Sequence, residues 1–187
     1  MVSRDPGFAF ENPNKFEAAR FATKFNHYQN ALTNGQKGFL RFSQAEINSY
    51  IRQSLTNLPS ATNTPGMHLK KFGIGLTPNN VQVYSWGEFR FLSMPLKFVA
   101  QRTYRIDQDG TNQWQMHLES FKVGELEIPK GCWDSVGEFV RPLDQPLTEQ
   151  FAWRTNIQAL LVRKNEVSER PELRLYTYKP IPAEDLR

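Results

Sequence analysis

The chain has one cysteine, Cys132, among its 187 residues, so no internal disulfide can form. Cysteine usage therefore does not distinguish a reducing cytosol from an oxidising compartment. Long apolar runs are also missing, since no stretch approaches the roughly 20 residues of a membrane-spanning helix. The first residues lack the features of a signal peptide. Either the protein is cytosolic, or a membrane anchor lies outside this sequence.

Nucleotide and metal motifs are absent as well. The glycines form no dinucleotide fingerprint, Walker sequence or nucleophile elbow. His27, His68 and His117 lie far apart, without the short spacings that place ligands around a metal. We expect neither a metal site nor a cofactor.

The positive charge is modest and scattered. The formal net charge is +4, and the lysines and arginines form no single run. A basic protein favours anionic partners such as nucleic acid or phospholipid headgroups. Scattered charges are more typical of a solvated surface than of a nucleic-acid site.

Aromatic residues are the most distinctive part of the composition. Only 39% of the residues are hydrophobic, yet the chain has 14 Phe, 6 Tyr and 4 Trp. Its length suits one ordinary domain with a core of its own. We therefore expect a single domain over residues 1–187, irregular over 1–12, with an aromatic core.

The first helix is predicted to begin at Asn12 and Pro13, an N-cap residue followed by proline at the first helical position. Asn34 and Gly35 supply the residues that end such a helix. One apolar stripe lies at Phe21, Phe25, Tyr28 and Leu32.

A second helix is predicted directly after the first. Ser43 and Glu46 have the spacing of a capping box, and Phe42 with Ile47 can form the hydrophobic staple. A third helix is indicated by the spacing of Trp133, Val136, Val140 and Leu143.

Between the second and third helices the period is two, which predicts antiparallel strands. A hairpin turns at residues 77–80, and a strand of about eleven residues covers 96–106. A phase shift between Leu118 and Phe121 indicates a bulge. Residues 157–164 and 173–178 form a closing hairpin. The predicted fold is α+β: a strongly curved antiparallel sheet packed around helices, with two N-terminal helices and one helix before the C-terminal hairpin.

Two arrangements offer chemistry in principle. Cys132 can act as a nucleophile if His117 approaches it. Glu125 and Glu127 share one face of a strand, as paired carboxylates would. The structural alternatives are favoured: a buried small cysteine, and carboxylates on the wet side of a strand whose Leu126 and Ile128 point inward. A hydrolase using these residues is the weakest hypothesis, and we expect no enzyme.

Aromatic and basic residues alternate in three places, in the segments 89–91, 97–98 and 102–105. Nucleic-acid-binding sheets use such alternation for base stacking and phosphate contact. A half-buried strand gives the same pattern, with aromatics facing a core or groove and the basic residues facing water. We favour the second interpretation.

Two segments resemble a known family. Phe42 to Ile51 is similar to the opening of a helix in small bacterial envelope proteins with a domain like the tubular lipid-binding (TULIP) fold. Phe121 to Pro129 is similar to the stretch that precedes a further helix in those proteins. The resemblance covers residues 40–178, and this chain differs by an extra N-terminal helix and by lacking a lipobox.

The resemblance implies a bent sheet wrapped around a helix, an apolar groove between them, an extracytoplasmic location and an N-terminal membrane anchor. We therefore expect a non-enzymatic domain that binds a lipid or other apolar ligand. The candidate groove-lining residues are Phe72, Phe89, Phe91, Phe98, Tyr104 and Trp114. The alternative is an interaction or scaffolding domain that docks an envelope protein through a sheet edge or an aromatic patch.

Overall fold

The fold was obtained as a computed structural model, which describes residues 14–57, 67–91, 94–108, 114–138 and 159–178. It is α+β with antiparallel strands, as predicted, and the strands are divided between two sheets. The larger sheet has the strand order β2 (Met67–Thr77), β3 (Asn80–Phe91), β4 (Met94–Gln108), β5 (Trp114–Val123) and β6 (Leu126–Glu127). The smaller sheet has the order β1 (Phe39–Ser43), β8 (Pro171–Tyr176) and β7 (Ala159–Lys164).

Helix α1 (Lys15–Thr33) starts two residues later than predicted. Asn14 is the N-cap, with an extended backbone and a side-chain oxygen that accepts the Phe16 N–H at 2.9 Å. The predicted cap at Asn12 and Pro13 lies outside the described residues. At the other end Gly35 has φ +64°, the left-handed geometry that ends a helix. The predicted end at Asn34 and Gly35 is confirmed.

The predicted apolar stripe of α1 is confirmed. Its aromatic residues are buried and pack with the first half of α2 (Gln44–Asn57) and with the smaller sheet. The buried members of this first core cluster include Phe21, Phe25, Tyr28, Phe42, Ile47 and Ile51, while Leu32 is half-buried against them. Burial of such aromatic area, at about 25 cal/mol per Å², is the main term that holds the helices to the sheets.

Strand β1 was not predicted. Residues 39–43 pair with β8 in register, so that Phe42 lies opposite Leu173. The strand runs directly into α2, because Ser43 is both its last residue and the first residue of the capping box. The predicted C-terminal hairpin is confirmed, and it joins β1 rather than the larger sheet.

The edge of the larger sheet at β2 is covered by polar side chains of α2. The Asn48 side chain donates to the Ile74 carbonyl at 2.8 Å and accepts the Ile74 N–H at 2.7 Å. One turn earlier, Gln44 accepts the Leu76 N–H at 2.9 Å. These side chains satisfy backbone groups that an edge strand would otherwise leave open.

The predicted hairpin, long strand and bulge are confirmed. Asn79, with φ +63°, closes the two-residue turn between β2 and β3. Strand β4 has 15 residues. Across β4 and β5, Thr103 pairs with Ser120 but Tyr104 pairs with Leu118, so Glu119 is the extra residue of a bulge.

The strand after β5 differs from its prediction. Ile128 is buried, but Leu126 is 68% exposed. The physical reason is that β6 pairs with β5 over only two residues after a turn at Gly124, so β6 is a short sheet edge. The third helix follows as a 3-10 turn, η1 (Lys130–Cys132), which continues as α-helix over residues 133–138. Val140 and Leu143 lie outside the described residues.

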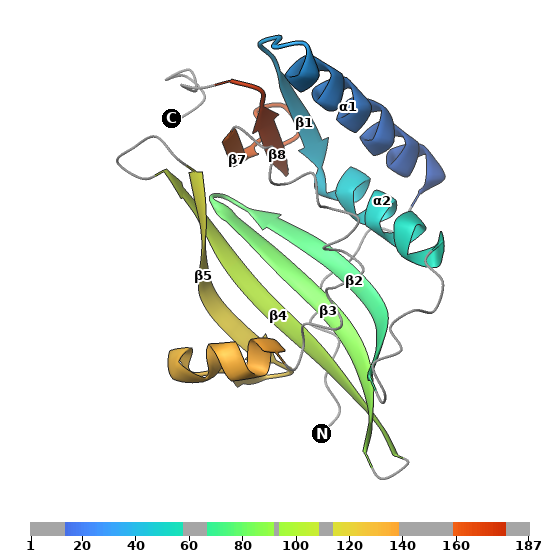
Figure 1. The fold of residues 1–187 in the computed structure, drawn as a ribbon, viewed down its shortest axis with the longest axis vertical. Coiled ribbons are helices and arrows are strands. Elements are labelled where there is room, and N and C mark those ends of the chain that lie inside the picture. Colours follow the sequence, from blue (N-terminus) through green and yellow to red (C-terminus); the bar gives the residue numbers. More distant parts are fainter. Residues whose placement is uncertain (1–13, 58–66, 92–93, 109–113, 139–158, 179–187) are drawn as a thin grey trace.

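The two groups of helices lie at different parts of the larger sheet. Figure 1 shows α1, α2 and the smaller sheet at one end, with the helix of residues 130–138 beside β5 further down. The β3–β4 hairpin extends past both groups to the far end of the molecule (Figure 1).

Candidate functional site

Four of the six predicted groove residues lie on one face of the larger sheet. Phe72 pairs with Ser85, and Phe98 pairs with Gly87, two residues before Phe89. Tyr104 is six residues after Phe98 in the same strand. Because strand residues an even number apart share a face, these four side chains project from the same side. We call this side the aromatic face. The side chains of Phe91 and Trp114 lie outside the described part of the structure.

Two sets of aromatic residues differ in burial. Phe72, Phe89, Phe98 and Tyr104 are all half-buried. By contrast, Phe21 of α1, Phe42 of β1 and Tyr176 of β8 are almost completely inaccessible, at 2%, 0% and 0% exposure. The core is therefore filled mainly by the second set, whereas the first set keeps accessible surface.

Apolar contacts occur at both ends of the aromatic face. At the α2 end, Phe72 packs against the first core cluster together with Ile74 and Val83. Toward the opposite end, a second cluster is formed by Ala100, Phe121 and Ile128, with Phe89, Phe98, Val123, Trp133 and Val136 packed against it. The indole N–H of Trp133 donates to the Ile128 carbonyl at 2.8 Å, which fixes the helix of residues 130–138 to this cluster.

A polar pair lies between the two clusters on the same face. Arg102 is opposite Phe121 in β5 and opposite Val83 in β3. One of its terminal nitrogens donates to the Ser85 hydroxyl at 3.0 Å, and Ser85 is completely buried. The pair places a cation among apolar side chains, where its interaction with an anion is strengthened by the low local dielectric.

The position of Arg102 corrects the sequence interpretation, which placed the basic residues of the aromatic and basic segments on the wet face. Arg105 is indeed exposed. Arg102 is two residues from Tyr104 and therefore shares its face. This two-residue spacing could have placed Arg102 on the aromatic face from the sequence alone, because residues two apart in a strand point to the same side.

The opposite face of the sheet holds a second aromatic pair. The rings of Tyr84 and Trp86 are stacked with centroids 5.8 Å apart, and the Tyr84 hydroxyl donates to Gln82 at 2.7 Å. Tyr84 is only 2% exposed. Burial raises its pKa above the ordinary value near 10, because the phenolate form is harder to desolvate.

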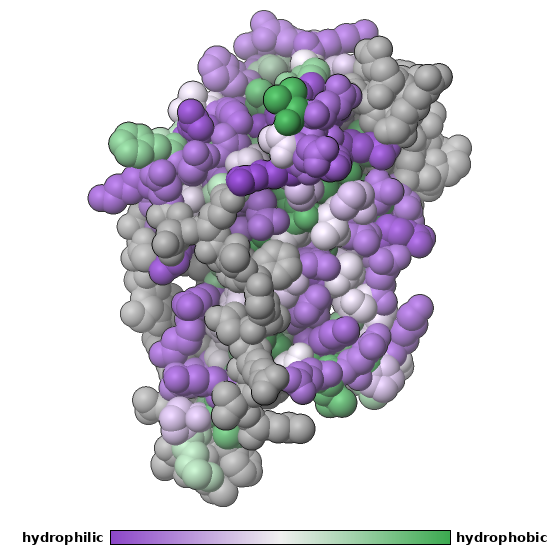
Figure 2. Space-filling view, turned by 180° about the vertical axis from the view of Figure 1, so that it is seen from behind, coloured by the Kyte–Doolittle hydropathy of each residue, from purple (hydrophilic) through white to green (hydrophobic). Residues whose placement is uncertain are grey.

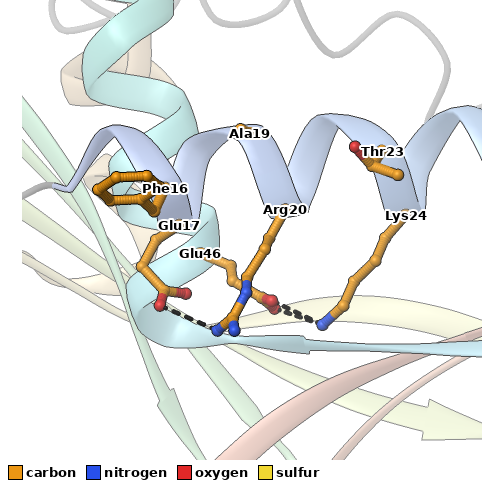
Figure 3. Close-up of a pocket in the computed structure, with 7 residues that line it drawn as sticks. All are labelled: Phe16, Glu17, Ala19, Arg20, Thr23, Lys24 and Glu46. Atoms are coloured by element: carbon orange, nitrogen blue, oxygen red, sulfur yellow. Dashed lines mark hydrogen bonds and ion pairs between the residues drawn. The ribbon is translucent and has the colours of Figure 1, made fainter.

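A charged depression of about 660 Å³ lies along α1 (Figure 3). The Lys24 ammonium contacts both carboxylate oxygens of Glu46 at 2.6 and 2.8 Å and donates to the Arg41 carbonyl at 2.8 Å. Glu46 also accepts the Ser43 N–H at 2.9 Å, while its own N–H donates to the Ser43 hydroxyl at 3.1 Å. The predicted capping box is thus confirmed, and its glutamate connects α1, β1 and α2. At the same depression, Arg20 pairs with Glu17 at 3.3 Å (Figure 3).

An adjoining depression of about 510 Å³ reaches the start of β8. Its buried carboxylate, Glu172, accepts from Arg174 at 2.9 Å and from the Asn165 amide at 2.8 Å, and Arg41 lies at 3.6 Å. Burial acts to lower the pKa of Arg174, but its hydrogen bond to Glu172 and the charge of that carboxylate raise the pKa overall. Asn165, Glu172 and Arg174 are near neighbours in the chain, whereas Arg41 comes from a segment more than 100 residues earlier, so the sequence alone does not link it to the other three.

The residues weighed for catalysis lie on the surface. Cys132 is exposed, so the interpretation of it as a buried small residue is wrong, whereas Glu125 and Glu127 are exposed as expected. His117 is also exposed and lies in β5, opposite Arg105. Among the described residues, no three metal-binding side chains come together. Within that same part of the chain, none of the helices has the length and apolar character needed to cross a membrane.

Comparison with known proteins does not place the chain in a family: no protein-family model matches it, and no curated protein matches it in sequence.

Proposed function

We propose that this protein is a non-enzymatic domain that binds an acyl chain or another elongated apolar ligand along the aromatic face. The supporting observation is that Phe72, Phe89, Phe98 and Tyr104 share one face and are all half-buried, while other aromatic residues fill the core. Sites for such ligands are mostly apolar, with a few placed polar groups. The aromatic face has this composition, because apolar clusters flank the Arg102 and Ser85 pair.

Arg102 gives the proposed ligand an orientation. A guanidinium group binds carboxylate and phosphate groups through parallel N–H donors. A ligand with an anionic head and an apolar tail would place its head near Arg102 and its tail along Phe98 and Phe89. Fatty acids and phospholipids have this chemistry.

The test is thermal unfolding of the delipidated protein with and without added fatty acid or phospholipid. A ligand that binds only the folded chain stabilises it by about 2.7 kcal/mol at roughly 100 times its Kd. For a chain of this size, that corresponds to a rise in Tm of roughly 5 to 10 °C. A Tm that no acyl ligand raises would contradict the proposal.

Paired variants locate the site in the same assay. Phe98→Ser should reduce the rise in Tm that the ligand produces, because it removes a ring from the aromatic face. Phe39→Ser is the matched control, since Phe39 is partly exposed on the other sheet. Comparing the ligand-dependent rise, rather than Tm itself, separates binding from any loss of stability.

An extracytoplasmic location and a membrane anchor rest only on the sequence resemblance to TULIP-like envelope proteins, and they form part of the proposal. Fractionation of cells that produce the full-length protein tests them. Recovery in the envelope fraction, released by detergent but not by salt, is the expected result. Recovery in the soluble cytosolic fraction would contradict this part.

Protein docking is the second candidate function, and the exposure of Phe16 favours it. Phe16 is 79% exposed at the start of α1, on the rim of the charged depression that contains Arg20 and Lys24 (Figure 3). Aromatic and arginine side chains are the common anchors of protein interfaces. An envelope partner that binds the wild type, but not Phe16→Ser or Arg20→Glu, would support this function. Val167→Ser, at a 95% exposed site in the turn before β8, is the control.

A further inference from the structure

The far end of the β3–β4 hairpin exposes apolar side chains. Met94 is 59% exposed and Leu96 is 51% exposed. They are two residues apart in β4, so they share the face that carries Phe98. Leu96 is also paired with the half-buried Phe89. In Figure 2, hydrophobic residues appear at the lower end of the molecule on a face that is otherwise mostly hydrophilic.

The other face of the same hairpin end is cationic. Lys97 in β4 is exposed and lies opposite Glu88, and Lys71 in the neighbouring strand β2 is exposed opposite Trp86. Lys70 forms an ion pair with Glu88 at 3.5 Å. Lys70, Lys71 and Lys97 thus carry three positive charges near the single negative charge of Glu88. The hairpin end is therefore amphipathic, with Met94 and Leu96 on one face and lysines on the other.

We propose that this hairpin end inserts shallowly into the surface of a membrane that contains anionic lipids. Met94 and Leu96 enter the boundary between headgroups and acyl chains, and Lys71 and Lys97 remain at the phosphates. Lysine side chains suit this position, because the apolar stem lies in the interface while the ammonium group stays at the headgroups. Apolar burial together with attraction to anionic lipid is the established basis of interfacial binding.

The geometry favours a membrane over a folded protein partner. The hairpin lies at an extremity of the molecule, beyond both groups of helices (Figure 1), so neither group stands between it and a flat surface. Among its described residues, the exposed apolar side chains are the flexible ones of Met94 and Leu96, whereas aromatic anchors dominate protein interfaces. This inference goes beyond the proposed ligand site, because the hairpin end can bind a bilayer whether or not the aromatic face holds a lipid.

The test is flotation of the full chain with phosphatidylcholine vesicles that either contain or lack phosphatidylglycerol. We expect binding to the vesicles with phosphatidylglycerol and clearly weaker binding to phosphatidylcholine alone. The double variant Met94→Gln with Leu96→Gln should weaken binding at least tenfold, since burying one such side chain contributes roughly tenfold or more. Lys97→Glu should weaken binding roughly tenfold on anionic vesicles, because it removes one attraction and adds one repulsion.

Met116→Gln is the matched control, because Met116 is 52% exposed in β5, a different strand of the same sheet. It should bind as the wild type does. The proposal is wrong if the wild type does not float, if it floats equally with both kinds of vesicle, or if the double variant binds like the control. Vesicle flotation measures binding of the hairpin end to a bilayer surface, whereas the thermal-unfolding assay measures binding of a lipid along the aromatic face. Either test can therefore fail while the other succeeds.

Discussion

The Glu46 carboxylate is predicted to be a main determinant of how α1 packs against the rest of the molecule. It is 4% exposed, binds Lys24 from α1 through both oxygens, and accepts the Ser43 N–H at the junction of β1 and α2. In Glu46→Ala, the start of α2 loses its capping box, which costs about 1 kcal/mol. Lys24 also loses its charged partner, which adds about 1 to 2 kcal/mol because its side chain is 37% exposed and can be partly rehydrated.

The expected total is about 2 to 3 kcal/mol, or a fall in Tm of roughly 8 °C for a chain of this size. Urea unfolding followed by circular dichroism measures the free energy. Arg20→Ala is the control in the same depression: its ion pair with Glu17 is largely exposed, at 69% for the arginine, so the loss should stay below about 0.5 kcal/mol.

A double-mutant cycle with Lys24→Met and Glu46→Gln measures the pair itself. We expect a coupling energy of about 1 to 2 kcal/mol. If Glu46→Ala is no more destabilising than Arg20→Ala, or if the coupling is absent, the connection between α1 and α2 through this pair is refuted.

Three further predictions concern stability. Asn48→Leu should lower the unfolding free energy by about 2 kcal/mol in urea titrations, because it leaves both backbone groups of Ile74 without the amide; an unchanged value would contradict that role. Gly35→Ala should lower the unfolding free energy by about 1 kcal/mol in the same titrations, because alanine is strained at a φ of +64°. An added Cβ meets no atom within 4 Å, so a larger loss would contradict this account. The raised pKa of Tyr84 means that folding stability is complete below pH 10 and falls as the pH rises through the folded-state pKa. Tyr84→Phe should remove that part of the alkaline loss, measured by unfolding at a series of pH values, and an identical pH dependence in the variant would contradict it.

The parts of the fold that were predictable have local signals. The capping box needs only Ser43 and Glu46, three residues apart, and the end of α1 needs only Gly35. The bulge at Glu119 was visible as a phase shift in one strand. Each of these features is decided by residues that are neighbours in the chain.

The parts that were missed depend on distant pairing. Strand β1 is five residues long and exists because it pairs with β8, more than 120 residues later. Asn48 interrupts the apolar pattern of α2, and only the position of the β2 edge explains its burial. Leu126 alternates correctly with Ile128, yet it is exposed because β6 is a two-residue sheet edge.

The candidate site shows the same division. Alternation placed Phe98 and Tyr104 on one face of β4, because a strand has a period of two. That Phe72 and Phe89 share this face required the register of β2, β3 and β4, and alternation did not predict how buried the face is. Arg102 was assigned to the wet side although its spacing from Tyr104 argued against this, and its contact with Ser85 required the register of β3 and β4.

The most direct test of the central claim is native mass spectrometry of the purified protein, followed by solvent extraction and lipid analysis. The proposed function predicts a near-stoichiometric adduct whose mass matches an extracted acyl lipid with an acidic head group, and which is reduced in Phe98→Ser but not in Phe39→Ser. An unliganded mass, together with an extract that contains no lipid, would contradict binding along the aromatic face.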